Sequence, residues 1–301
     1  MPQALPVGAK DYYEFFPTVS HRAGDIWSDL PTLGMLSISH APGLVITPAC
    51  DLQNNKVESI TYLPIVSIRQ AFCLRGFFPE VRRVLDAQLS ALGLQRVSEV
   101  VARYVPLEPG TIDQITEKIA EVSSKLKPDS KQRENVKRAL IGIKIIRFAY
   151  GSSVSVPTGA DLCTFLGDKQ FSEIMGRIVT NGYKSDVHFL PPDLQQPEWS
   201  VIPDPSLVLF RFPLSAPIEI FDNAEDTQLT DWMAEVSRLS VCAPGAEAFR
   251  AKRPMKRQTL RPRFLADLIT RYVSMHVRLG APDFTDDGIE KYIQQVKERP
   301  E

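Results

Sequence analysis

The clearest chemical feature of the sequence is a strongly basic segment, RAKRPMKRQTLRPR, at residues 250 to 263. It contains no acidic residue, and its cations are Arg250, Lys252, Arg253, Lys256, Arg257, Arg261 and Arg263. Clustered Lys and Arg can displace counterions from a phosphate backbone and so bind nucleic acid with little sequence preference. The same charges could instead dock on the chain's own acidic segment, residues 222 to 226, or on an acidic partner protein. Two Arg-Pro pairs favour a stiff, extended backbone here rather than a helix.

A second group of reactive residue types ends the apolar run GLVITPACDL at residues 43 to 52. Cys50 could act as a nucleophile, but a thiolate is disfavoured beside Asp51, and the turn holds no basic residue to stabilise it. We therefore expect Cys50 to be a small buried residue and Asp51 to hydrogen bond to its own backbone in the turn. Thr47, Cys50 and Asp51 remain candidates for a binding rim.

The spacing of metal-binding residue types indicates no metal site. The four histidines are His21, His40, His188 and His276, and no two are four residues apart as on one face of a helix. The four cysteines, Cys50, Cys73, Cys163 and Cys242, form no CxxC pair, so we expect reduced and mostly buried thiols rather than zinc ligands or disulfides. No glycine-rich phosphate loop or nucleophile elbow is present, and we expect no cofactor.

The overall composition is that of a globular protein, with 44% hydrophobic and 24% charged residues and a net charge of −1. A net charge so close to zero gives no global reason to expect binding to nucleic acid or to a membrane. The N-terminus lacks the basic flank and apolar core of a signal peptide. No apolar run approaches the roughly 20 residues of a membrane span. We therefore expect a cytoplasmic protein without a membrane partner.

The periodicity of apolar residues divides the chain into three zones. Residues 1–69 contain short runs rich in Ile, Val, Thr, Tyr and Trp that predict strands, with residues 53–56 as a hairpin connection. Residues 70–184 change to helical spacing, with a break expected at Gly93. Residues 185–301 return to strands up to residue 213, then an acidic loop at 221–228 and C-terminal helices. We expect early and late strands to share one sheet, with the helical zone inserted between them.

The order GDIWSDLPTLG, HAPGLVITP and SITYLPIVS, within residues 24–67, resembles the beginning of MazF/PemK-type toxins. This resemblance implies a small SH3-like β-barrel. With the change of period at residue 70 and back near 185, we expect an α+β fold in which this barrel is interrupted by the helical insertion and followed by C-terminal helices. The resemblance also implies RNA as a ligand and a place in a bacterial conflict system, such as a toxin-antitoxin or phage-defence system.

The chain also resembles a group of uncharacterised bacterial proteins with a Ser/Thr-x-x-Cys-Asp-Leu element, here residues 47–52. Further parts of that likeness are Leu190-Pro191-Pro192 and the segment at residues 278–282. The likeness covers most of the chain but implies no activity.

The chain departs from the toxins where their chemistry is performed. The toxins place an arginine before the proline of the second strand, whereas this chain has Ala41 before Pro42. Alanine cannot stabilise a phosphorane, and loss of one such donor typically costs about a hundred-fold or more in rate. If the chain is an endoribonuclease, His40 and Ser67 would have to substitute.

Three hypotheses for the function follow. The first, which we favour, is a non-catalytic binding or regulatory protein for nucleic acid, RNA more than DNA, or for an acidic protein. The second is a divergent, metal-independent endoribonuclease of MazF/PemK type that uses His40 and Ser67. The third is a purely protein-binding regulator, which requires an apolar patch on the helical insertion.

Overall fold

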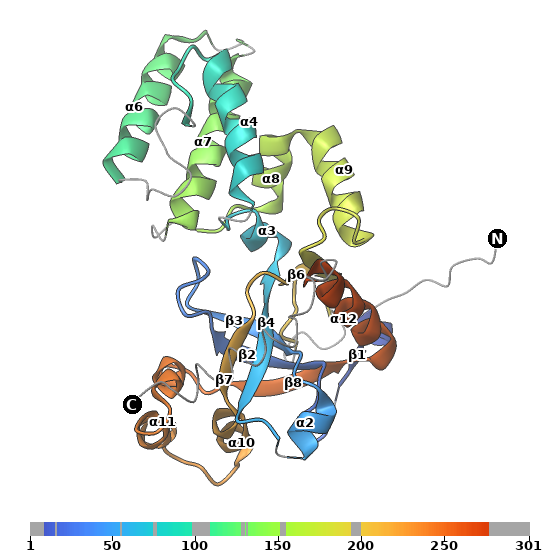
Figure 1. Cartoon of the computed structure of the whole chain (residues 1–301). Coiled ribbons are helices and arrows are strands. Elements are labelled where there is room, and N and C mark those ends of the chain that lie inside the picture. The colour runs from blue at the N-terminus through green and yellow to red at the C-terminus, as the bar shows by residue number, and fades with distance from the viewer. Residues whose placement is uncertain are drawn as a thin grey trace, which may run out of the picture.

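The computed structural model describes residues 9–15, 17–54, 56–74, 77–97, 109–127, 130, 132–150, 155–193 and 200–276. Within these ranges an antiparallel sheet lies below a group of helices, and more helices flank the sheet (Figure 1). The expected α+β class is confirmed.

The sheet has the strand order β1-β8-β2-β3-β4-β6-β5, with β7 also paired to β4, and all of its pairs are antiparallel. The strands are β1 (Tyr13–Glu14), β2 (Asp25–Pro31), β3 (His40–Val45), β4 (Ser59–Ser67), β5 (Val187–Leu190), β6 (Ser206–Leu209), β7 (Leu214–Pro217) and β8 (Met255–Leu260). No pairing among the described strands joins β1 to β5. The sheet is therefore open, and the expected SH3-like barrel is not confirmed.

Strand β4 joins the early and late parts of the chain. On one side it pairs with β3, and on the other it pairs first with β7 and then with β6. Between β4 and β5 the described residues form helices and their connections. The early and late strands thus share one sheet, as the return of strand-like segments near residue 185 indicates.

Neighbouring residues of the central strands enter different cores, because successive side chains of a strand point to opposite faces. These neighbours are Ile26 and Trp27, Leu44 and Val45, and Leu63 and Tyr62. The face of Trp27 packs against α10 (Ile218–Glu225), α11 (Trp232–Ser240) and the 3-10 helix η1 (Pro244–Phe249). The face of Ile26 packs against α12 (Pro262–His276). Burial on both faces explains why these strands carry apolar residues at neighbouring positions.

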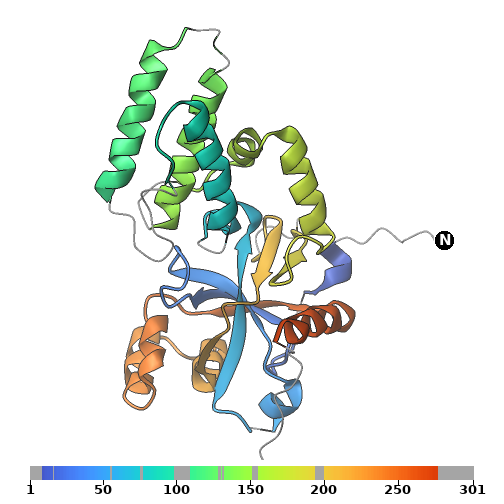
Figure 2. The same ribbon diagram turned by 45° about the horizontal axis from the view of Figure 1, so that its top comes forward.

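The helices between β4 and β5 form a third core. They are α3 (Ile68–Ala71), α4 (Phe78–Ala91), α6 (Pro109–Lys125), α7 (Gln132–Ala149), α8 (Gly159–Leu166) and α9 (Asp168–Val179). Their core includes Val187 and Phe189 of β5, together with Leu207 and Leu209 of β6. The helices therefore rest on the β5–β6 end of the sheet, as Figure 2 also shows.

Three local segments either differ from their expected form or lie outside the described residues. The acidic segment expected as a loop is largely helix α10, because Ile220, Phe221 and Ala224 are spaced to bury one helical face. The expected hairpin connection at residues 53–56 begins inside a short helix, α2 (Ala49–Gln53). The segment at residues 278–282 lies outside the described residues. The remaining helix, α1 (Ala9–Tyr12), precedes β1.

Gly43 occupies a crowded position in β3. A Cβ atom there would lie 2.6 Å from Leu30 Cδ1 and 2.8 Å from Tyr62 Cδ2. We expect Gly43→Ala to lower the free energy of unfolding by about 1–3 kcal/mol, because the Tyr62 ring is held by a hydrogen bond to Pro31 O. The control is Gly176→Ala within α9, where no atom lies within 4 Å of the new Cβ. Urea unfolding should separate the two variants, and equal midpoints would contradict the packing described.

A buried histidine of β5, His188, faces helix α12. His188 Nδ1 lies 3.9 Å from Asp267 Oδ2 of α12 and has no hydrogen bond among the described residues. Burial lowers the pKa of His188 from 6.5 to about 4; nearby Asp267 raises it in part, and Arg271 lowers it further. His188 is therefore neutral in the folded protein at neutral pH.

This burial predicts a specific loss of stability in acid. The folded-state pKa lies below the unfolded-state value, so stability is fully present above pH 6.5 and declines from there towards about pH 4. Between about pH 7 and pH 5, His188 should account for a loss of roughly 2 kcal/mol. Urea unfolding at both pH values should show a smaller loss for His188→Gln than for the unchanged protein, with the exposed His276→Gln as control. An unchanged pH dependence in His188→Gln would refute this assignment.

Candidate polyanion-binding segment

The basic segment runs along the sheet rather than away from it. It begins at the end of η1, continues through β8 and ends in the first turn of α12. Strand β8 lies between β1 and β2 (Figure 1). Its central part is therefore extended, as the Arg-Pro pairs predict, but it also belongs to the interior of the fold.

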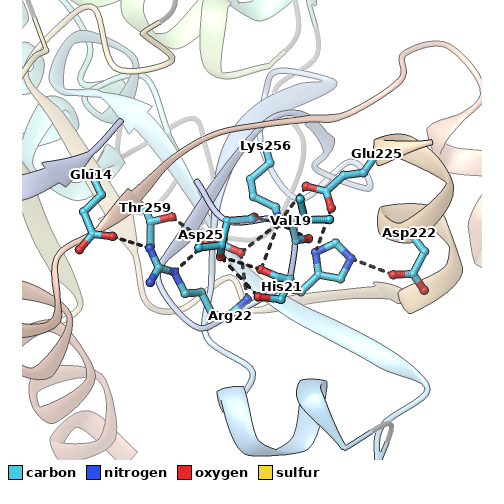
Figure 3. Close-up of polar contacts among 11 residues, drawn as sticks. Glu14, Val19, His21, Arg22, Asp25, Asp222, Glu225, Lys256 and Thr259 are labelled. Carbon is cyan, nitrogen blue, oxygen red and sulfur yellow. Dashed lines mark hydrogen bonds and ion pairs between the residues drawn. The ribbon is translucent and has the colours of Figure 1, made fainter. Parts of the chain in front are cut away.

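Lys256 is the most deeply buried cation of the segment, with its side chain 3% exposed. Its Nζ lies 2.8 Å from Glu225 Oε1 and 3.6 Å from Asp25 Oδ2. It also donates to the carbonyl oxygens of Thr18 and Val19 at 3.0 and 3.2 Å (Figure 3). These contacts attach the chain before β2 and helix α10 to β8, so Lys256 is a structural cation.

Asp25 is the buried anion of this network, with its side chain fully inaccessible. It accepts hydrogen bonds from the backbone N–H of Arg22 at 2.9 Å and from Thr259 Oγ1 at 2.7 Å. Burial raises the pKa of Asp25, and Lys256 exerts the largest opposing influence. Arg22 continues the network to Glu14 of β1.

His21 closes the network on the side of α10. Its Nε2 lies 2.9 Å from Asp222 Oδ1, and its ring packs 5.6 Å from Trp27 and 6.3 Å from Phe221. Figure 3 shows the imidazole pointing toward Asp222. The sequence offers no local signal for this contact, since the two residues are 201 positions apart.

Arg253 docks on the acidic segment through the backbone, not through carboxylates. It donates to the carbonyl oxygens of Ala224 at 3.0 Å, Leu229 at 3.1 Å and Asp226 at 2.5 Å. Self-docking, one of the alternatives that the sequence left open, thus occurs at Arg253 and Lys256.

Three other cations of the segment are about half exposed and make surface ion pairs, and Arg263 also donates to Asp11 O at 3.4 Å and lies 4.5 Å from the centre of the Phe264 ring. Arg250 lies 2.9 Å from Glu247, Lys252 lies 2.8 Å from Asp29, and Arg263 lies 3.9 Å from Asp11. Their side chains are 48%, 52% and 64% exposed, respectively. Such pairs are each worth about 0–1 kcal/mol, so a phosphate could replace the carboxylate at little cost.

The remaining two cations each contact another residue of the fold. Arg257 Nη2 lies 3.2 Å from Met255 Sδ, and Arg261 Nε donates to Tyr13 O at 3.2 Å. Of the seven cations, Arg250, Lys252 and Arg263 are therefore the most readily offered to a partner.

His40 and Ser67 are engaged in separate local contacts. Ser67 caps helix α3: its Oγ accepts from Gln70 N at 3.2 Å, and its own N–H donates to Gln70 Oε1 at 3.1 Å. His40 Nδ1 lies 3.1 Å from Ser39 Oγ, and burial together with Lys252 lowers the pKa of His40. Neither contact joins the two candidate catalytic side chains.

The rim candidates have structural surroundings. Thr47 is buried and its Oγ1 accepts from Thr61 N at 2.7 Å. Cys50 and Asp51 lie in α2, where Cys50 is exposed and its Sγ lies 3.6 Å from Asp51 Oδ1. The expectation of a buried Cys50 is wrong, because the helix turns Leu52 into the core instead. Cys242 is exposed as well.

The described part of the chain offers neither a cluster of metal ligands nor a membrane-spanning helix. In it, no group of three or more His, Cys, Asp or Glu side chains is arranged to hold a metal ion. None of its helices has the length and apolar character needed to cross a membrane.

The chain matches no protein-family model, no curated protein and no solved structure. The resemblance to the toxins therefore rests on the short motifs in residues 24–67 and stays a prediction.

Proposed function

We propose that the chain is a non-catalytic binding protein that holds a polyanion, single-stranded RNA in the first instance, on the exposed cations of its basic segment. The observation that carries the proposal is the exposure of Arg250, Lys252 and Arg263, whose ion pairs all lie on the surface. Strand β8, between Lys252 and Arg263, has six residues and so spans about 20 Å. Single-strand binding sites cover roughly 4–16 nucleotides, which is long enough to contact both ends.

The separate roles of His40 and Ser67 support binding rather than cleavage. A catalytic pair needs a base within about 3 Å of the group it deprotonates, and Ser67 Oγ is already used in the cap of α3. A role in a bacterial conflict system, and the choice of RNA over DNA, rest on the toxin resemblance. We also propose that the open sheet is a divergent form of the SH3-like barrel.

The test combines a mobility-shift assay with a denaturing gel on mixed single-stranded RNA, single-stranded DNA and duplex DNA at two salt concentrations. We expect a salt-sensitive shift, strongest for RNA, with the nucleic acid intact. Cleavage lost in His40→Ala or Ser67→Ala would replace the proposal with the endoribonuclease hypothesis. Absence of any shift at low salt would overturn nucleic-acid binding and leave an acidic protein as the partner to be sought.

A further inference from the structure

A groove separate from the basic segment lies among the helices between β4 and β5. It is a cavity of about 580 Å³ lined mainly by α4 and α9, and its floor includes Phe72, Val81 and Leu166. These floor residues belong to the helical core. Ligand pockets for small molecules typically measure about 300–1,000 Å³ and have an apolar lining with a few polar groups, so the size and floor suit a small organic molecule.

Three arginines from three different helices line this groove: Arg83 of α4, Arg138 of α7 and Arg177 of α9. Arg138 Nε donates to Phe165 O at 2.9 Å, and Arg177 Nη2 donates to Gly182 O at 3.2 Å. A guanidinium has five N–H donors, so one carbonyl contact orients each group and leaves it able to bind a carboxylate or phosphate.

The groove carries a net positive charge despite two acidic side chains. Glu80 and Glu173 also line it, but Glu80 lies 3.3 Å from Lys184 Nζ. The charge of the Glu80 carboxylate is therefore balanced by Lys184 and not by the arginines. The excess of cations favours an anionic ligand.

Tyr183 adds a hydrogen-bond donor to this lining. Its hydroxyl is buried and makes no hydrogen bond of normal geometry among the described residues. Burial, and then a hydrogen bond to Glu80, raise the pKa of Tyr183, so the hydroxyl keeps its proton. The hydroxyl can donate to a ligand oxygen in place of Glu80.

We propose that this groove binds a small organic anion, with its apolar body on Phe72, Val81 and Leu166 and its carboxylate or phosphate head at Arg138 and Arg177. The site goes beyond the polyanion-binding function, since it lies in the helices and uses none of the cations of the basic segment. A failure of RNA binding would therefore not count against this site, and a failure of this site would not count against RNA binding.

The test is a fluorescence titration with anilinonaphthalene sulfonate, which joins an aromatic body to an anionic head, and with its uncharged analogue N-phenylnaphthylamine. We expect saturable binding of the sulfonate at one site per chain. The double variant Arg138→Met/Arg177→Met should weaken the sulfonate at least about ten-fold, because it removes two charge-assisted hydrogen bonds, and should leave the uncharged probe nearly unchanged.

Two further variants make the result decisive. Arg133→Met/Lys137→Met removes two exposed cations of α7 that do not line the groove, and should bind as the unchanged protein does. Ala87→Trp fills the groove from an exposed position of α4 and should abolish binding of both probes even if the double arginine variant does not fold. Sulfonate binding that survives Ala87→Trp would overturn the proposal, as would equal loss of both probes in an arginine variant that is folded by circular dichroism, or no binding by the unchanged protein.

Discussion

Replacing Lys256 by methionine is expected to lower the free energy of unfolding by about 3–5 kcal/mol, because it removes one of the two cations beside the buried Asp25 and the nearest cation of Glu225. Asp25 is fully inaccessible and Glu225 is one-quarter exposed, and both lie within 3.6 Å of Lys256 Nζ. Methionine keeps most of the apolar stem, so the loss reports the charge. The carbonyl oxygens of Thr18 and Val19 lose their donor as well.

Lys252→Met is the matched control for this expectation. Lys252 belongs to the same segment and also pairs with an aspartate, Asp29, but its side chain is 52% exposed. Surface pairs of this kind contribute about 0–1 kcal/mol. Denaturant unfolding should therefore separate the two lysines by several kcal/mol. Equal losses would show that the network around Asp25 does not stabilise the fold.

A second variant tests whether unbalanced charge causes the loss of stability in Lys256→Met. Adding Glu225→Gln to Lys256→Met removes the carboxylate that lies nearest to Lys256 Nζ. We expect the double variant to be more stable than Lys256→Met alone. A further loss of stability would instead indicate that packing, and not charge, explains the effect of Lys256.

The second large effect concerns the affinity of the protein for single-stranded RNA. The triple variant Arg250→Ala/Lys252→Ala/Arg263→Ala should bind single-stranded RNA at least about ten-fold more weakly at low salt, since each cation that neutralises a phosphate releases a counterion. The protein should stay folded, because the three ion pairs lie on the surface. Fluorescence anisotropy with a labelled RNA measures the loss.

Its control is Lys118→Ala/Lys125→Ala/Lys137→Ala on helices α6 and α7. This variant makes the same change in net charge at three exposed lysines distant in sequence from the segment. If RNA binding depended only on net charge, both triple variants would weaken it equally. We expect only the first to do so.

Local signals in the sequence predict much of the sheet and little of the charge network. Strands β3 and β4 follow from their β-branched and aromatic runs between turn residues. The spacing Ser67-x-x-Gln70 is that of a capping box, a local signal that is sufficient to identify Ser67 as a candidate helix cap. Thr158-x-x-Asp161 is the equivalent signal for the start of α8, within the zone of helical spacing.

The partners of the basic segment could not be predicted in this way. Lys252 pairs with Asp29, 223 positions away, and Lys256 with Asp25 and Glu225 on two other elements. Charge counts show that a segment is basic, but burial of a cation depends on strand order. Because β8 lies between β1 and β2, the same segment contributes a buried cation, Lys256, and exposed cations at its two ends.

The salt dependence of RNA affinity tests the central claim most directly. For single strands the slope of log affinity against log salt is about −0.7 per neutralised phosphate, so losing three contacts should reduce it by roughly 2. We predict this reduction for Arg250→Ala/Lys252→Ala/Arg263→Ala and an unchanged slope for the lysine control on α6 and α7. Identical slopes in the unchanged protein and in both variants would show that the exposed cations of the basic segment do not hold the polyanion.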